Sequence, residues 1–260
     1  MRFALIGHPV TGSLSPRLFE AAYGGRYPYD LIEESAFDAA WARFLAGYDG
    51  INVTAPFKQD AYASVDRLTP DALATGAVNL VVRSGGETVG YNTDVEGVLG
   101  AVRETGLPVS DALIVGAGGA ARAAAVAALR LGCRVTIANR TLSKAETLAA
   151  TLGCQAIPLA DVTSLAPDLV VYTIPGGNGR SVPAMTGAPK SAPSSVIPGL
   201  TGNLLRNAVV LEAEYKHPRL SEIPCRAYAG GRRWLLWQAV AGYALFTGEQ
   251  PDLEKMSAAI

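Results

Sequence analysis

The sequence contains little charge, few cysteines and few histidines, and each shortage excludes a class of protein. Charged residues make up 17% of the 260 residues and the net charge is −1. The chain therefore lacks the basic surface of proteins that bind nucleic acid or anionic membranes. The three cysteines are odd in number and widely spaced, which is typical of reduced thiols in a cytoplasmic protein. With two histidines and no Cys/His cluster, we expect no metal site.

Long uninterrupted apolar runs are also missing. Hydrophobic residues make up 49% of the chain, but charged residues interrupt every long run, so we expect no membrane-spanning segment. The first ten residues, MRFALIGHPV, are predicted to form a strand rather than a signal peptide, because their apolar run is short and no small-residue cleavage site follows it. What is left is a globular protein with one large core or two moderate ones.

Apolar strand-like segments alternate with Ala- and Leu-rich helical segments, which predicts an α/β fold with parallel sheet. Ser15 is expected to be the N-cap of the first helix, with Pro16 at its first position. Gly85 and Gly86 are expected to form the turn of a hairpin. In the first hundred residues we expect strands at 2–9, 29–34 and 50–54, helices at 15–24, 37–47 and 95–106, and the hairpin within 76–94.

A new unit begins at Asp111, and two domains are predicted: residues 1–97, to which residues 234–260 return, and residues 98–233. The apolar stripe of the closing helix is too broad for a helix with one solvent-facing side, so this helix is expected to pack back on the first domain. In the second unit we expect a strand, turn, helix and strand over 111–141, a helix at 143–153, strands at 155–159, 168–175 and, last, 208–215, a loop over 176–195 and the closing helix at 232–248.

The turn GAGGAA fits the pattern G-x-G-x-x-A directly after a strand and at the start of a helix. Its glycines permit a tight turn and let a pyrophosphate approach the backbone, while the helix N-terminus offers free N–H groups. The pattern alone is weak, but strand, turn, helix and second strand follow in the order that dinucleotide binding requires. The predicted cofactor-binding residues of this turn are Gly116, Ala117, Gly118, Gly119 and Ala120.

The residues after the second strand of this unit indicate which dinucleotide binds. An NAD site usually places Asp or Glu there for the ribose 2′-hydroxyl. This chain instead has Asn139, Arg140, Thr141 and Lys144. A guanidinium, a hydroxyl and an ammonium suit a 2′-phosphate, which a carboxylate would repel. The sequence therefore predicts NADP as the cofactor.

Polar side chains stand at the ends of successive elements in the first domain, where α/β folds place binding residues. A lone lysine at a helix start is usually solvated, and asparagines near turns are usually only turn residues. Together, however, hydroxyl, amide, ammonium and carboxylate groups suit a small polyhydroxylated acid. The candidates are Ser13, Ser15, Thr54, Lys58, Asn79, Asn92 and Asp94.

With these residues in place, the chain resembles the shikimate dehydrogenase family. The segments that carry the resemblance follow the family's order and cover nearly the whole length: GHPVTGSLSP, INVTAPFK, GAVN, GYNTDVEG, GAGGAARA, NRTLSKAETLA and LLWQAVAGYALFTG. The resemblance implies an N-terminal α/β substrate domain, a C-terminal Rossmann domain that binds NADP, and an active site in the cleft between them. It also implies reversible, NADP-dependent reduction of 3-dehydroshikimate to shikimate in aromatic amino-acid biosynthesis, with either a monomer or a homodimer possible.

The resemblance further implies roles for single residues. Ser13 and Ser15 are expected to hold the substrate carboxylate, and Lys58 and Asp94 to form the catalytic pair. Removing the alcohol proton as hydride leaves suits a lysine beside a carboxylate. Which of the two moves the proton stays open, although we favour a direct role for Lys58. The remaining implied residues are Thr54, Asn79, Tyr215 and Gln238 for the substrate, and Ala213 and Gly231 for the cofactor.

The chain departs from the family pattern at several positions. Gly12 replaces a usual His, and Phe19-Glu20 replaces a usual His-Asn, which is expected to remove two polar groups from the substrate side. Arg232 and Arg233 precede the glutamine helix, where they are either solvated or provide a cation near substrate or cofactor. The segment YTIPGGNG lacks the family's Met. These departures concern the exact substrate more than the reaction class.

Three alternatives remain. A paralogue acting on quinate or aminoshikimate would keep the same catalytic pair, although Arg140 argues against an NAD-preferring quinate enzyme. A non-catalytic NADP or metabolite sensor would not need Lys58 and Asp94. Another Rossmann oxidoreductase, such as a folate- or tRNA-linked reductase, would share GAGGAARA but should lack SLSP and NVTAPFK.

Overall fold

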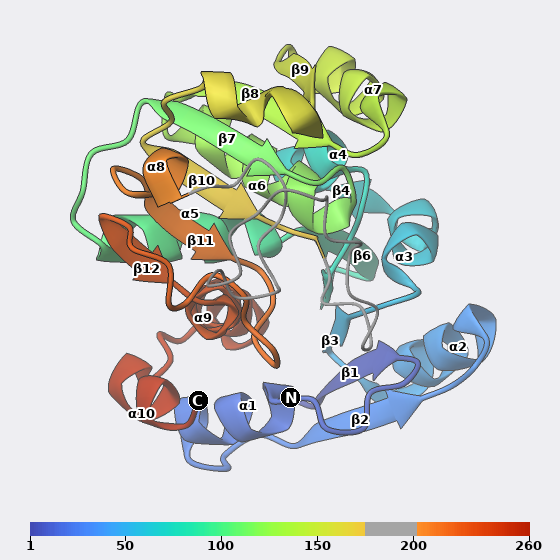
Figure 1. Ribbon diagram of the computed structural model, residues 1–260. Coiled ribbons are helices and arrows are strands. Elements are labelled where there is room, and N and C mark those ends of the chain that lie inside the picture. Colours follow the sequence, from blue (N-terminus) through green and yellow to red (C-terminus); the bar gives the residue numbers. More distant parts are fainter. Residues whose placement is uncertain (175–201) are drawn as a thin grey trace. The chain divides into compact units, whose positions relative to one another are not determined.

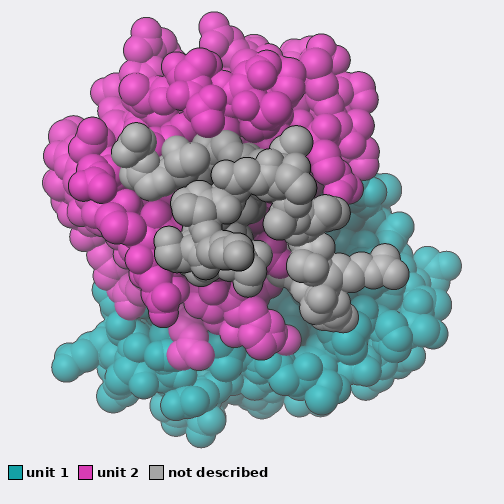
Figure 2. Space-filling model, viewed as in Figure 1, with its two compact units in different colours: residues 1–97, 235–260 teal, residues 98–234 magenta. Residues whose placement is uncertain are grey.

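The structure is a computed structural model that describes residues 1–174 and 202–260. The chain divides into two compact units, residues 1–97 with 235–260 and residues 98–234 (Figure 2). The stretch 176–195, predicted to be a loop, lies outside the described residues. The segment after Ile174 in which the family's Met is missing lies outside them as well.

The described residues of the first unit form a six-stranded sheet in the order β2-β1-β3-β5-β6-β4 (Figure 1). Strands β2, β1 and β3 are parallel, β5 runs antiparallel to β3 and β6, and β4 is parallel to β6. The strands are β1 (Phe3–Gly7), β2 (Tyr29–Glu33), β3 (Gly50–Val53), β4 (Arg67–Leu68), β5 (Leu80–Ser84) and β6 (Glu87–Tyr91).

The predicted hairpin is confirmed. Strands β5 and β6 pair with Ser84 opposite Glu87, and the two glycines between them have φ values of +62° and +89°. A two-residue hairpin loop with positive φ at both positions matches the right-handed twist of the strands, and glycine adopts that backbone without a Cβ clash.

Helices cover both faces of this sheet. One face packs against α2, α3 and α4 through a cluster that includes Ile6, Phe44 and Ile51. The other packs against α1, α9 and α10. The helices are α1 (Ser15–Tyr23), α2 (Phe37–Gly47), α3 (Lys58–Ser64), α4 (Pro70–Thr75), α5 (Asp94–Glu104), α9 (Gly231–Thr247) and α10 (Leu253–Ala258).

The start of α1 corrects one prediction. The N-cap position is Leu14, so Ser15 is the first helical residue rather than the cap. The hydroxyl of Ser13 accepts the backbone N–H of Ser15 at 3.2 Å, which satisfies a donor that the first turn of a helix leaves free. A serine hydroxyl therefore does bond to the first turn of this helix, but it belongs to Ser13 rather than to Ser15.

The return of the chain's end to the first unit is confirmed. Aromatic rings of α9 and α1 share one cluster with β1: Phe246 stacks on Phe3 with ring centroids 4.7 Å apart, and Phe19 lies 4.8 Å from Tyr243. The prediction that α9 closes the fold is wrong in one respect, because α10 follows it. Met256 of α10 is fully buried in the same cluster.

The described residues of the second unit form a parallel six-stranded sheet in the order β12-β11-β10-β7-β8-β9. This is the doubly wound dinucleotide-binding order, read from its far edge. A short strand, β12, follows β11, so the prediction that β11 is the last strand is wrong. The strands are β7 (Asp111–Val115), β8 (Arg134–Asn139), β9 (Gln155–Pro158), β10 (Leu169–Tyr172), β11 (Val209–Glu212) and β12 (Ala227–Ala229).

Alanines let the first helix of this unit lie close to the sheet. Helix α6 packs against β7, β8 and β10, and its inward face consists of buried Ala residues with Val126. A second cluster on β7, β10 and β11 includes Val162 and Leu205 from the short helices η1 and α8. The helices are α6 (Gly119–Arg130), α7 (Leu142–Leu152), η1 (Leu159–Ser164) and α8 (Gly202–Leu205). Among the described residues, no helix has the length and apolar character needed to cross a membrane.

The aromatic cluster of the first unit predicts a large loss of stability for Phe19→Ala. Phe19 is 1% exposed and contacts the rings of Phe3, Tyr29 and Tyr243. The free energy of unfolding should fall by about 3–5 kcal/mol in urea titrations, because the change leaves a cavity. The matched control is Leu73→Ala, since Leu73 is 56% exposed, and it should change stability by less than about 0.5 kcal/mol. Equal effects of the two changes would contradict this role for Phe19.

Candidate active site

The topology of the first sheet gathers the predicted polar residues at one edge. The chain runs from β1 outward to β2 and then returns to β3 on the other side of β1, so the loops after β1 and β3 are adjacent. Ligands bind at such reversals, outside the carboxyl ends of parallel strands. The loop after β1 carries Ser13 and leads to Ser15, and the loop after β3 carries Thr54 and leads to Lys58.

Asp94 and Asn79 lie at the same edge, but their positions follow from the antiparallel part of the sheet. Strand β6 is parallel to β3, because both are antiparallel to β5. Asp94, which follows β6, therefore lies at the edge where β3 ends. Asn79 comes directly before β5, and the amino end of an antiparallel strand lies at that same edge. This explains why Asn79 precedes its strand whereas the other candidates follow theirs.

Close backbone packing brings the loops after β1 and β3 into contact. The backbone N–H of His8 donates to the Ala55 carbonyl at 3.1 Å, and that of Thr54 donates to the Ile6 carbonyl at 3.0 Å. A Cβ at Gly7 would collide with Thr54 Cγ2 and lie 3.0 Å from the Ala55 carbonyl oxygen. Position 7 therefore requires glycine for the two loops to meet.

The predicted catalytic pair is in direct contact. Lys58 Nζ lies 2.6 Å from Asp94 Oδ2, where Lys58 is the first residue of α3 and Asp94 is the first residue of α5. The Lys58 side chain is 33% exposed and that of Asp94 is 15% exposed, so the pair is sheltered but reachable. A charge-assisted hydrogen bond of this length fixes the ammonium group while leaving its other two protons for a ligand.

A buried turn holds Asp94 and Asn79 in place. The Asn92 amide donates to Thr75 Oγ1 at 2.8 Å and to the Ala77 carbonyl at 3.0 Å, while its oxygen accepts the backbone N–H of Asp94 at 3.1 Å. Both donors of the amide and one acceptor position of its oxygen are thus used inside the protein, so Asn92 holds the turn that leads to Asp94.

Thr93 holds the Asn79 side chain in place, and this role was not predicted from the sequence. Its backbone N–H and its hydroxyl both donate to Asn79 Oδ1, at 2.7 and 3.2 Å. Asn79 Nδ2 has no hydrogen-bond acceptor among the described residues. The orientation of the amide is thus fixed with its donor side free, as a residue that binds a hydroxyl group requires.

The two serines lie side by side at the entrance to α1. The Ser13 hydroxyl donates to the Ser15 hydroxyl at 3.2 Å, and both residues are half-buried. Glu33, at the end of β2, holds the loop before them: its Oε2 accepts the backbone N–H groups of Val10 and Thr11, at 3.0 and 3.1 Å, and the Thr11 hydroxyl at 2.9 Å. The sequence shows Glu33 as a carboxylate at the end of a predicted strand, but it does not show which groups hydrogen-bond to that carboxylate.

Gln238 lies on α9, and a close contact of that helix indicates the direction it faces. A Cβ at Gly242 would lie 2.6 Å from Leu80 Cδ1 and 3.6 Å from Thr93 Cγ2. Gln238 stands one turn before Gly242 on the same face of the helix. Leu80 and Thr93 are the chain neighbours of Asn79 and Asp94, so Gln238 belongs to the face of α9 that meets the candidate residues.

The departures from the family pattern have structural reasons in three cases. Gly12 has a φ of +81°, a left-handed backbone that favours glycine. Phe19 points into the aromatic core, so it supplies packing rather than a missing polar contact. Arg233 forms an ion pair with Glu104, with Nε 2.7 Å from Oε2, whereas Arg232 is exposed. Of the two arginines, then, Arg233 has a structural partner.

In the second unit, the Gly-rich turn lies where the strand order reverses between β7 and β10. Gly116 has a φ of +125°, and a Cβ there would collide with Thr173 Oγ1. The Thr173 hydroxyl donates to the Val115 carbonyl at 2.9 Å, which joins the ends of β7 and β10. Gly118 and Gly119 are exposed at the start of α6, and Ala117 and Ala120 are half-buried. The turn therefore offers an open backbone at a helix N-terminus.

The predicted 2′-phosphate residues surround the start of α7. The Asn139 amide donates to the Thr141 carbonyl at 3.0 Å, which closes the turn between β8 and α7. Arg140, Thr141 and Lys144 are exposed. Within the described part of the chain, neither Arg140 nor Lys144 forms an ion pair, so both cations are available to an anion.

The remaining candidates, Ala213, Tyr215 and Gly231, also lie in the second unit. A Cβ at Gly231 would lie 2.9 Å from the carbonyl carbon of Ala213, so these two backbones touch. Buried Glu212 shapes the loop that carries Tyr215: its carboxylate accepts the N–H groups of Arg219 and Leu220, at 2.8 and 3.0 Å, and the Tyr228 hydroxyl at 2.9 Å. Sequence reasoning missed this role of Glu212.

Comparison with known proteins then identifies the family. A shikimate dehydrogenase (NADP(+)) from Halobacterium salinarum is 37% identical over 273 residues, which cover 99% of this chain and 97% of that protein. The chain belongs to the shikimate dehydrogenase family. A second family member, the shikimate dehydrogenase (NADP(+)) of Carboxydothermus hydrogenoformans, is 32% identical over 98% of this chain and 95% of its own length.

Both halves of the chain match shikimate dehydrogenase family models. Residues 5–81 match the shikimate dehydrogenase substrate binding domain, and residues 101–174 match shikimate / quinate 5-dehydrogenase. The fold is similar to the crystal structure of shikimate 5-dehydrogenase from Thermus thermophilus in complex with NADP(H) and shikimate. The TM-score is 0.81, the sequence identity 30%, and the match covers 100% of this chain and 98% of that one. The predicted α/β fold class and the resemblance to this family are confirmed.

The contacts of Glu33 predict a pH-dependent stabilisation. The N–H of Val10, with the Thr11 hydroxyl and N–H, lowers the pKa of the Glu33 carboxyl below its ordinary value. A carboxylate with a lowered folded-state pKa stabilises the protein at neutral pH, and this contribution is lost as the pH falls through that pKa. Glu33→Gln should therefore be less stable than wild type in urea unfolding at neutral pH, and the difference should shrink at about pH 3.

Glu20→Gln is the control for this prediction, because the exposed Glu20 side chain has no hydrogen-bond or ion-pair partner among the described residues. Its effect on stability should be small at both pH values. A Glu33→Gln difference that stays constant from neutral to acid pH would show that the carboxylate charge does not hold the loop.

Proposed function

We propose that this protein is an NADP-dependent dehydrogenase that reversibly reduces 3-dehydroshikimate to shikimate, a step in aromatic amino-acid biosynthesis. One observation carries the proposal: Lys58 and Asp94 form a 2.6 Å pair at the same sheet edge that gathers Ser13, Ser15 and Asn79. An acid/base pair beside several free hydrogen-bonding groups suits a polyhydroxylated acid that reacts at an alcohol carbon. The names of the relatives support the same substrate and cofactor.

The first unit would bind the substrate through groups of complementary chemistry. The Ser15 hydroxyl would donate to the carboxylate, and the Ser13 hydroxyl would turn away from Ser15 to donate to it as well. Asn79 would use its free Nδ2 for a ring hydroxyl, and Thr54 and Gln238 would bind further hydroxyls. Tyr215 of the second unit is proposed as an additional substrate contact.

Lys58 would act on the reacting oxygen. In reduction, its ammonium group donates a proton to the oxygen of the ketone as that oxygen gains negative charge, and in oxidation the neutral amine takes the proton back. The hydrogen bond from Nζ to Asp94 aims the ammonium group and leaves it two further donors for the substrate. Asp94 is then the residue that orients Lys58, and the proton itself moves at Nζ.

The residues of the second unit fit NADP. The exposed backbone of Gly118 and Gly119 at the start of α6 would admit a pyrophosphate, and Gly116, where a Cβ would collide with Thr173, permits the tight turn before it. Exposed Arg140 and Lys144, with no ion-pair partner in the described ranges, suit the 2′-phosphate. Asn139 and Thr141 shape the turn that presents them, and Ala213 and Gly231 are proposed as further cofactor contacts. When bound, NADP supplies the nicotinamide that accepts or returns the hydride.

We propose that the protein is a cytoplasmic enzyme that acts on small molecules. All three cysteines are free in the structure, and unpaired thiols are typical of a reducing compartment.

Initial rates measured by NADPH absorbance test this function directly. Purified protein should oxidise shikimate with NADP faster than quinate with NADP, and faster than shikimate with NAD. Preference for quinate would establish the paralogue instead. Tight NADP binding without turnover of shikimate, quinate or aminoshikimate would indicate a sensor on the same fold.

Lys58→Ala should lower kcat by about 10²- to 10⁴-fold, the usual contribution of a general acid/base. The dissociation constant for NADP, measured by fluorescence titration, should change little because Lys58 lies in the first unit. Lys255→Ala is the matched control, since Lys255 is exposed and pairs with Asp252 near the C-terminus. Retention of more than about a tenth of the wild-type kcat in Lys58→Ala would refute a direct proton-transfer role.

Arg140→Gln should weaken NADP binding by about 10- to 100-fold, because a hydrogen bond to a charged phosphate is lost. Binding of NAD, which has no 2′-phosphate, should stay within about twofold. The control is Arg134→Gln: Arg134 begins the same strand, β8, and pairs with Asp111, with Nε 2.7 Å from Oδ1. Equal weakening of NADP and NAD in Arg140→Gln would place this arginine elsewhere on the cofactor.

A further inference from the structure

One buried hydroxyl connects α9 to the serine that we propose as a carboxylate ligand. Tyr243 Oη donates to the backbone carbonyl of Ser15 at 3.0 Å, although the two residues are 228 positions apart. Tyr243 is 1% exposed. Burial raises the pKa of Tyr243 well above its ordinary value, so the hydroxyl stays protonated and remains a donor.

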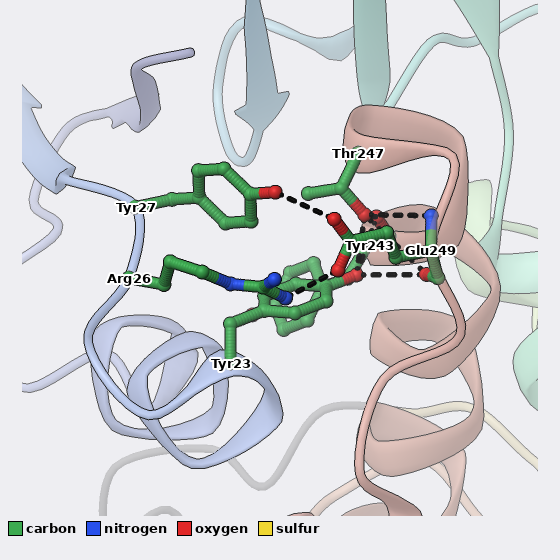
Figure 3. A network of polar contacts seen from close by, with 6 residues as sticks. All are labelled: Tyr23, Arg26, Tyr27, Tyr243, Thr247 and Glu249. Atoms are coloured by element: carbon green, nitrogen blue, oxygen red, sulfur yellow. Dashed lines mark hydrogen bonds and ion pairs between the residues drawn. The ribbon is translucent and has the colours of Figure 1, made fainter.

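The tyrosine itself is firmly held. Its backbone carbonyl accepts the Tyr23 hydroxyl at 2.8 Å and the Thr247 hydroxyl at 3.1 Å (Figure 3). Figure 3 also shows Glu249 reaching the loop after α1, where it accepts the Tyr27 hydroxyl at 2.8 Å and pairs with Arg26. These bonds fix the end of α9 against α1, so the position of the Tyr243 hydroxyl is determined by the fold.

The same helix carries Gln238, five residues before Tyr243. An α-helix is stiff over this length, so the bond from Tyr243 to Ser15 sets the distance between two proposed substrate contacts. Ser15 is the first residue of α1, so its carbonyl also takes part in the hydrogen-bond pattern of that helix. The Tyr243 hydroxyl adds a bond to this carbonyl from outside the helix, and the Ser13 hydroxyl accepts the Ser15 N–H.

We propose that Tyr243 is a positioning residue for substrate binding: its hydroxyl holds the Ser15 backbone so that the Ser15 side chain meets the substrate carboxylate in register with Gln238. This inference rests on the proposed function. Tyr243 does not touch the reacting atoms, so its loss should weaken shikimate binding and leave the chemical step almost unchanged.

Tyr243→Phe tests the inference, because it removes one oxygen and keeps the ring in the aromatic cluster. The KM for shikimate should rise by about threefold to tenfold, the factor expected for one hydrogen bond. The KM for NADP and kcat should stay within about twofold. The matched control is Tyr48→Phe, which removes the hydroxyl of another buried tyrosine of the first unit, one that donates to Asp30 Oδ2 at 2.9 Å and lies outside this network. It should lower the melting temperature and leave the KM for shikimate unchanged.

A double-mutant cycle with Ser15→Ala separates positioning from general loosening of the fold. If Tyr243 acts through the Ser15 side chain, Tyr243→Phe should raise the KM for shikimate by less than about twofold in the Ser15→Ala background. Equal factors in both backgrounds would mean that Tyr243 stabilises the junction without aiming Ser15, and would overturn the inference.

The remaining outcomes are also decisive. Normal turnover of shikimate by wild type, with an unchanged KM in Tyr243→Phe, would overturn the inference alone. Absence of shikimate turnover in wild type would overturn the proposed function, and this inference with it.

Discussion

The structure depends on one topological constraint, the reversal of strand order within each sheet. In the first unit the chain reverses at β1 and β3, and in the second at β7 and β10. Where the order reverses, two neighbouring loops leave the sheet in opposite directions and leave room outside the strand ends. The candidate loops after β1, β3 and β7 leave the sheets at these reversals, and the loop after β6 leaves the first sheet at the same end as the loop after β3. Topology therefore determines where the candidate loops lie, and their side chains determine what those loops can bind.

Buried polar side chains hold the loops that carry the candidate residues in place. Asn92 uses both ends of its amide within the turn before α5, and Thr93 satisfies one side of Asn79. Glu212 performs a similar task for the loop after β11. Because a buried polar group without a partner is costly, each of these residues has few alternative arrangements. The groups left with free donors, such as Asn79 Nδ2, thereby acquire fixed directions at little entropic cost to a ligand.

Local sequence patterns were enough to predict part of the fold and part of the candidate site. The glycines at 85 and 116 require a backbone that other residues avoid, and the basic residues after β8 occupy a position whose role follows from the motif. The contact of Lys58 with Asp94 spans 36 residues, and only the family resemblance paired them before the structure did. Strand β12 was not predicted, because a strand of three residues is too short to show a periodic pattern. The bond from Tyr243 to Ser15 could not be predicted either, because it depends on the packing of segments that are far apart in the sequence.

The first unit is built from both ends of the chain, which has a consequence for synthesis on the ribosome. Residues 98–234 form a contiguous unit and emerge before residues 235–260, which complete the first one. Until α9 and α10 appear, Phe3, Leu18 and Phe19 lack the apolar surface that covers them in the finished protein. Residues 98–234 are thus able to fold while the apolar face of the N-terminal segment is still uncovered. The segment that is synthesised first is therefore completed last.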